Sequence, residues 1–163
     1  MELLFGWLEH GALSTWIRED PFAFPALVVM HTIGMGVVVG TAAAIDLRLL
    51  GVAPGVPVAA MTRFLPFGWG GFVLNAASGV GLLIAYPTKA LTNPVFYLKL
   101  TCIFLAAWTL RVIGRGLDGP EPQTRLRRLA MASLALWATG IGAGRLLAYT
   151  YRYLLIGFPN HNI

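Results

Sequence analysis

The chain has 163 residues, of which 57% are hydrophobic and only 12% are charged, and its mean hydropathy is +0.71. This composition excludes an ordinary soluble domain, in which about 25% of the residues are charged. The net charge of +5 comes mainly from arginines beside apolar segments, so it requires no nucleic-acid partner. We therefore expect an all-α integral membrane protein that contacts the lipid bilayer.

Residues 1–21 are expected to lie along the membrane surface as an interfacial amphipathic segment. They contain two short stretches, Glu2–Glu9 and Ser14–Asp20, in which tryptophans stand beside charges. Such patterns are typical of helices in the plane of the interface. Ser14 is the expected N-cap of a helix of one or two turns, and Pro21 predicts the end of that helix.

Residues 22–163 are expected to form one four-helix transmembrane bundle. The expected spans are 22–50, 64–86, 94–114 and 129–150. Each has the length of about 20 residues that a helix needs to cross about 30 Å of hydrocarbon. The connections are rich in the proline and glycine that end helices, and Pro94 is expected to start the third span.

The distribution of basic residues predicts the orientation of this bundle. Most of them lie around the first and third connections, at positions Arg48, Arg63, Arg111, Arg115, Arg125, Arg127 and Arg128. The second connection carries only Lys89. Because cytoplasmic loops carry the excess of basic residues, the first and third connections should face the cytoplasm. Both termini then lie on the periplasmic side of a bacterial inner membrane.

Helix packing in this bundle is expected to depend on small residues. Gly36 and Gly40 form a GxxxG motif, which allows two helix backbones to approach closely. His31 is five residues before Gly36, about 140° around the helix, so it should face another part of the interior.

Two further expectations concern polar and aromatic residues near the helix ends. Asp46 is expected to form an ion pair with Arg48 or Arg63 and so to join the first two spans. The indoles of Trp69, Trp108 and Trp137, like the nearby tyrosines Tyr149, Tyr151 and Tyr153, are expected to anchor the bundle at the interface or toward lipid.

Three ionisable residues, His31, Lys99 and Arg145, each lie inside a different apolar stretch. A charged group in hydrocarbon costs about 2.5 to 3.5 kcal/mol on insertion scales, so a shared polar role is expected. All three fall in the outer half of the predicted bundle. This arrangement predicts a b-type haem with His31 on the iron and the two cations paired to the propionates.

Other readings of the same residues remain open. His31 can donate to a backbone carbonyl of a neighbouring helix, and Lys99 and Arg145 can extend to the outer headgroups. Met35 lies one turn after His31, which suggests a copper(I) site as an alternative to haem. Asn75 is expected to hydrogen-bond between helices or to contact the edge of a cofactor or a quinone.

Two short motifs carry a resemblance to a known superfamily. The stretches Val28-Val-Met-His31-Thr-Ile-Gly34 and Tyr97-Leu-Lys99-Leu100 resemble the four-helix membrane protoporphyrinogen oxidases and copper-resistance D proteins. By this resemblance His31 and Lys99 would be the important pair, and haem b would be bound. The chain is also similar to small bacterial membrane proteins of that superfamily to which no activity is attached.

Two classes of function follow from these observations. The first is a haem-b protein that transfers electrons with a partner, which would be another membrane or periplasmic protein or a quinone. The second is a cofactor-free accessory subunit whose glycine-rich faces dock onto a larger membrane complex. In either class the chain is not expected to be an enzyme on its own. The single cysteine, Cys102, excludes an internal disulfide, and no phosphate-binding loop, dinucleotide motif or zinc motif occurs.

Overall fold

The computed structural model describes residues 10–117, 119 and 121–150, and these ranges contain helices and no strands. The elements are α2 (Ala12–Glu19), α3 (Ala23–Leu49), the 3-10 helix η1 (Val58–Phe64), α4 (Leu65–Ala85), α5 (Pro87–Leu91), α6 (Pro94–Leu117) and α7 (Gln123–Thr150). Four helical segments, namely α3, η1 with α4, α6 and α7, are long and apolar enough to cross a membrane. The predicted all-α class is confirmed, while the expectation for Glu2–Glu9 lies outside the described residues.

The helices follow the predicted spans closely, except at the start of the fourth. Helix α7 begins at Gln123, six residues before the apolar stretch at 129–150. The backbone amide of Arg125 donates to the Pro122 carbonyl at 3.0 Å, which starts the helix directly after the proline. The hydropathy pattern predicts only the apolar part of this helix, because the first two turns of α7 carry exposed arginines.

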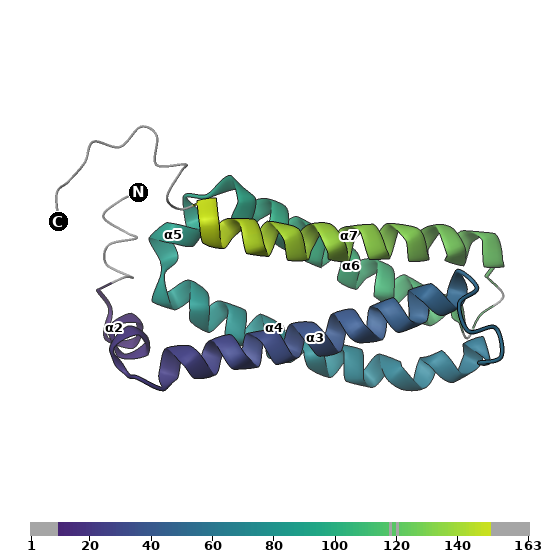
Figure 1. The fold of residues 1–163 in the computed structure, drawn as a ribbon, viewed down its shortest axis with the longest axis horizontal. Helices are drawn as coiled ribbons and strands as arrows, with labels where there is room; N and C mark the ends of the chain where they lie inside the picture. The colour runs from purple at the N-terminus through teal and green to yellow at the C-terminus, as the bar shows by residue number, and fades with distance from the viewer. Residues whose placement is uncertain (1–9, 118, 120, 151–163) are drawn as a thin grey trace.

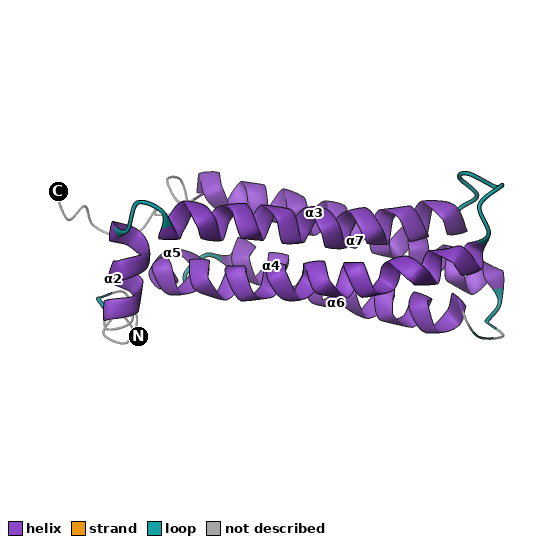
Figure 2. Cartoon of the chain, turned by 90° about the horizontal axis from the view of Figure 1, so that it is seen from below, coloured by secondary structure: helices purple, strands orange, loops and turns teal. Residues whose placement is uncertain are grey.

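The long helices run antiparallel (Figures 1 and 2). The α3–η1 and α6–α7 connections lie at one end, which we call the arginine end. Helices α2 and α5 and the last turn of α7 lie at the other end, which we call the α2 end. The two connections with most of the basic residues are therefore neighbours in space.

Helices α3 and α4 form a close hairpin because glycines let their backbones meet. A Cβ atom added at Gly34 would lie 2.6 Å from the backbone nitrogen of Asn75, and one at Gly71 would lie 2.8 Å from the backbone nitrogen of Val38. Gly36 and Gly40, the GxxxG motif expected to support close helix packing, do not make this contact. An added Cβ atom at either position would meet nothing within 4 Å, since Gly36 is two residues from Gly34 and points to the opposite side of the helix.

Helices α6 and α7 form a second hairpin, and the two hairpins join near the arginine end. Their shared core contains Ile45 and Leu49 of α3, Leu110 and Ile113 of α6, and Ala130 of α7. The Arg127 guanidinium of α7 donates from Nε to the Leu49 carbonyl at 3.1 Å. Toward the α2 end the two hairpins diverge (Figure 1).

Helix α2 covers the end of α4 at the α2 end. Its Ser14 and Ile17 are buried, while Leu13 and Trp16 are exposed, so the helix is amphipathic as expected. The prediction that Ser14 is the N-cap is wrong. Gly11 takes that position, and the Ser14 hydroxyl instead donates to the Ala85 carbonyl at 3.3 Å.

The segment between α2 and α3 breaks the helix before Pro21, as predicted from the sequence. Helix α2 ends at Glu19, before Pro21. The Asp20 carboxylate then accepts the backbone amides of Phe22 and Ala23 at 2.9 and 2.8 Å, which satisfies donors at the start of α3.

The expected ion pair of Asp46 does not form. Arg48 donates to the carbonyls of Pro54 and Val56 in the α3–η1 connection, and the Asp46 carboxyl is fully buried and makes no hydrogen bond. The two side chains are two residues apart and so lie on different faces of α3, with Asp46 toward the interior of the bundle.

The prediction of a lipid-facing anchor is also wrong for Trp137. Its side chain belongs to the core and is only 5% exposed. Trp108 is exposed as expected, Trp69 is half-buried, and Tyr151 and Tyr153 lie outside the described residues.

Candidate functional site

His31 is held in place by the neighbouring helix α4. Its Nδ1 atom lies 3.0 Å from the Asn75 carbonyl oxygen and 3.2 Å from the Ser78 hydroxyl. In return, the Asn75 side-chain amide donates to the His31 carbonyl at 2.8 Å. These reciprocal contacts are made where Gly34 brings the two backbones together. The imidazole orientation is therefore fixed by the α3–α4 hairpin itself.

This contact also fixes which ring nitrogen can bind a ligand. A carbonyl oxygen only accepts hydrogen bonds, so the hydrogen on Nδ1 is donated to Asn75. The Ser78 hydroxyl donates its own hydrogen to the Leu74 carbonyl at 2.7 Å. In the neutral ring the lone pair then lies on Nε2. Metal-binding histidines usually show this same arrangement, with the other nitrogen donating to a carbonyl or carboxylate.

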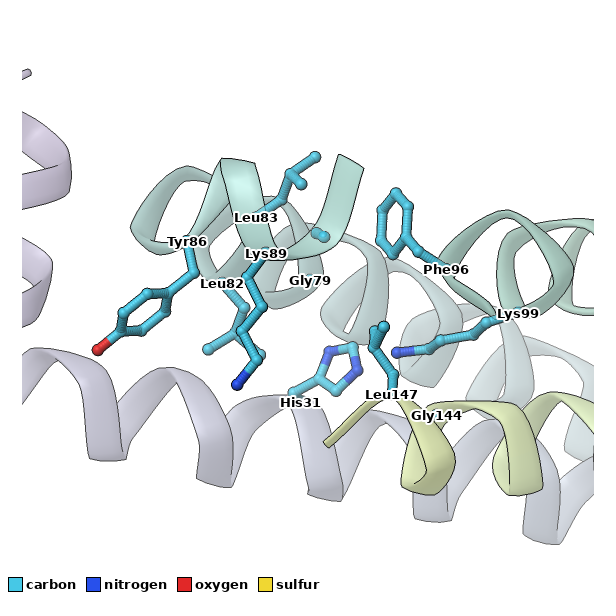
Figure 3. A pocket seen from close by; sticks show the side chains of 11 residues that line it. His31, Gly79, Leu82, Leu83, Tyr86, Lys89, Phe96, Lys99, Gly144 and Leu147 are labelled. Atoms are coloured by element: carbon cyan, nitrogen blue, oxygen red, sulfur yellow. The ribbon is translucent and has the colours of Figure 1, made fainter. Parts of the chain in front are cut away.

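Two adjoining cavities lie between the diverging hairpins, and both are lined by His31. The larger has a volume of about 560 Å³ and the smaller about 240 Å³. They share one residue from each long helix, namely His31, Leu82, Lys99 and Gly144. The smaller cavity continues toward the α2 end, where Tyr86, Lys89 and Phe96 line it (Figure 3).

Lys99 reaches these cavities from α6 and passes alongside Gly144 of α7. A Cβ atom added at Gly144 would lie 3.5 Å from the Lys99 Cε atom. In Figure 3 the Lys99 amine and the His31 ring point toward one another, with Leu147 between them. Among the residues that the structure describes, no carboxylate pairs with Lys99.

The larger cavity also brings together the other residues singled out in the sequence. Met35, Asn75 and Arg145 line it together with His31 and Lys99. Arg145 is exposed at the side of the bundle, and the Asn75 amide is occupied by its hydrogen bond to the His31 carbonyl. Of the two readings of Asn75, the contact between helices is the one observed.

The same cavity contains a functional candidate that sequence reasoning missed. Trp137 lines it with Gly140 and Gly144, at spacings of three and four residues that place all three on one face of α7. That spacing was the signal that could have placed Trp137 inside.

The arrangement can bind an apolar ligand that carries an anionic group. Apart from the polar residues named above, its walls are mainly apolar, with Val28, Leu82, Ile103 and Ile141 among them. The two cations lack an anionic partner within the described part of the chain. That same part contains no group of three or more His, Cys, Asp or Glu side chains able to hold a metal ion.

Comparison with models of protein families, with curated protein sequences and with solved structures finds no match to this chain.

Proposed function

We propose that this chain is a multi-pass protein of a bacterial inner membrane, and that it binds haem b between its two hairpins and transfers electrons with a partner. The observation that carries the proposal is the His31 imidazole, which donates through Nδ1 to Asn75 and presents Nε2 beside a cavity that Lys99 and Arg145 also line. The resemblance of the segments around His31 and Lys99 to haem-binding membrane proteins also supports a haem site.

Insertion into a bilayer is supported by the outer surface of the bundle. The side chains of Phe67, Val73, Phe104 and Trp108 are between 58% and 67% exposed although they are large and apolar. Such a surface suits lipid better than water. The concentration of arginines at one end favours that end as the cytoplasmic one. In this orientation the α2 end and the proposed haem would lie in the periplasmic half.

The residues around the larger cavity fit haem b. His31 would bind the iron through Nε2, and Lys99 and Arg145 would hold the propionates. The volume of about 560 Å³ lies within the range of about 300 to 1,000 Å³ common for cofactor sites. Haem would supply one-electron redox chemistry. The chain itself would fix the imidazole, shield the macrocycle with apolar side chains and neutralise its carboxylates.

The test is the visible spectrum of detergent-purified protein before and after reduction with dithionite, with metal analysis of the same sample. We expect a Soret band that shifts on reduction. It should be lost in His31→Ala and retained in His10→Ala, because His10 is exposed at the α2 end and outside both cavities. A colourless, iron-free wild-type protein would refute haem binding, and copper in that sample would support a copper(I) site at His31 and Met35 instead.

One observation favours the accessory-subunit alternative. Gly36 and Gly40 form a small-residue surface on the outside of α3 that no other described segment covers. Small residues on one face of a helix permit close packing of another helix. If the purified protein is colourless and crosslinks through this surface to a larger complex, the accessory role replaces electron transfer.

A further inference from the structure

Asp46 is the most unusual polar residue in the core. Its side chain is fully buried in α3, and neither carboxyl oxygen makes a hydrogen bond with the described residues. Arg48 and Arg127 do not pair with Asp46. Arg48 donates to carbonyls of the α3–η1 connection, and Arg127 donates to the Leu49 carbonyl. An ionised carboxylate without a cation is very unfavourable in such a place, so burial favours the protonated form of Asp46.

The other unsatisfied groups of the described core both belong to α7. They are the hydroxyl of Ser133, which is fully buried, and the indole nitrogen of Trp137. Ser133 lies next to the Asp46 carboxyl, although not in the geometry of a hydrogen bond. By contrast, the buried hydroxyls of Ser14 and Thr109 donate to carbonyls. The unsatisfied groups are therefore Asp46 on α3 and two residues one helical turn apart on α7.

These three residues lead from the arginine end to the larger cavity. Ser133 and Trp137 are four residues apart on α7 and so lie one above the other on the same face. Trp137 also lines the larger cavity. Asp46, on α3, is three residues from the end of that helix at Leu49. The order along the bundle axis is the arginine end, Asp46, Ser133, Trp137 and the cavity.

We propose that Asp46, Ser133 and Trp137 form a proton path between the arginine end and the cavity. This inference goes beyond the proposed function and does not depend on what the cavity binds. Its central element is a neutral carboxylic acid, which is a common component of proton relays inside membrane proteins.

The transfer moves one proton and breaks no bond other than O–H bonds. The Asp46 hydroxyl gives its proton to the Ser133 oxygen, and Ser133 passes its own proton to water that enters from the cavity. Trp137 only donates hydrogen bonds, because an indole nitrogen has no lone pair to accept one, so it takes no proton in the transfer. The Asp46 carboxylate then regains a proton from water at the arginine end.

The first measurement is infrared spectroscopy of the purified protein in lipid vesicles at neutral pH. We expect the carbonyl band of a protonated carboxylic acid in the wild type and its loss in Asp46→Asn. In case Asp46→Asn does not fold, a chain with Asp20→Asn and Asp118→Asn retains Asp46 as its only aspartate. Aspartate labelled with carbon-13 in the carboxyl group then identifies the band without a change in the core.

The second measurement is the rate at which this band shifts after transfer from H₂O to D₂O. We expect Ser133→Ala to slow the exchange on the order of tenfold, because one proton-transferring group is lost from the path. Thr139→Val is the matched control, since its hydroxyl is on the same helix but exposed and donates to Ala135. An absent band, no exchange, or equal rates in the wild type and Ser133→Ala would overturn the proposal.

Discussion

At the scale of single residues, the position of His31 depends on a glycine three residues further along α3. Gly34 lets the α4 backbone approach until the Asn75 carbonyl reaches the imidazole. The atoms that an added Cβ atom would meet are a backbone nitrogen and a backbone oxygen, which cannot rotate away. The site is therefore sensitive to a single methyl group at a position that itself touches no ligand.

We predict that Gly34→Ala lowers the free energy of unfolding by about 1 to 3 kcal/mol, the usual cost of forcing extra volume into a packed core. Gly36→Ala should instead raise it by about 0.5 to 1 kcal/mol, because its side chain meets nothing and alanine favours a helix. Denaturant unfolding in detergent, followed by circular dichroism, measures both variants. Equal effects would contradict the described face of α3.

The residues that could be found from the sequence are those whose chemistry conflicts with an apolar stretch. His31, Lys99 and Arg145 stand out for that reason, and the structure brings them to one cavity. Asp46 stands out equally, but its expected ion pair was wrong, because nearness in sequence does not show on which side of a helix a side chain lies. Trp137 carries no charge and so gave no such signal.

At the scale of helices, the boundaries could be predicted because proline, glycine and hydropathy mark them. The choice of packing face could not, since a GxxxG motif names small residues without showing what lies opposite. In α3 the contact is made by Gly34, while the motif at Gly36 and Gly40 faces outward. The residues that Gly34 contacts, Gly71 and Asn75, are on α4, and only the folded structure shows that they lie opposite it.

The arginine end is expected to depend on one hydrogen bond between the hairpins. Arg127→Ala removes the donor to the Leu49 carbonyl at the end of α3 and should destabilise the protein by about 1 to 2 kcal/mol. Arg125→Ala is the matched control. It removes an exposed ion pair with Glu121 one turn away, which contributes only about 0.2 to 0.5 kcal/mol. Thermal unfolding of the two variants gives the comparison, and a larger loss for Arg125→Ala would refute it.

Helix α2 should detach when its buried face is disrupted. Ser14 is 1% exposed and donates to Ala85, so Ser14→Leu brings a side chain that has no space there. We expect trypsin to cut after Arg18 faster in this variant than in the wild type. Leu13→Ala, at a position 55% exposed, should leave the rate unchanged. An unchanged rate in Ser14→Leu would show that other contacts hold the helix.

At the scale of the whole molecule, the proposed orientation predicts opposite accessibility of the two ends. In a chain with Cys102→Ala, a new cysteine from Thr92→Cys marks the α2 end and one from Gly55→Cys marks the arginine end; both positions are exposed. A maleimide that does not cross membranes should label only the Thr92→Cys chain in intact spheroplasts. Labelling of both chains should follow lysis, and the reverse pattern would invert the orientation.

The division into two hairpins has a consequence for assembly. Helices α3 and α4 carry the complete support of His31, whereas Lys99 and Arg145 come from α6 and α7. Neither hairpin alone contains the site, and an occupant of the cavity would join the two at the end where they diverge. The protein is built like a heterodimer whose subunits are linked through α5. Cut within α5, the two halves should reassociate, and ligand should strengthen their association by mass action.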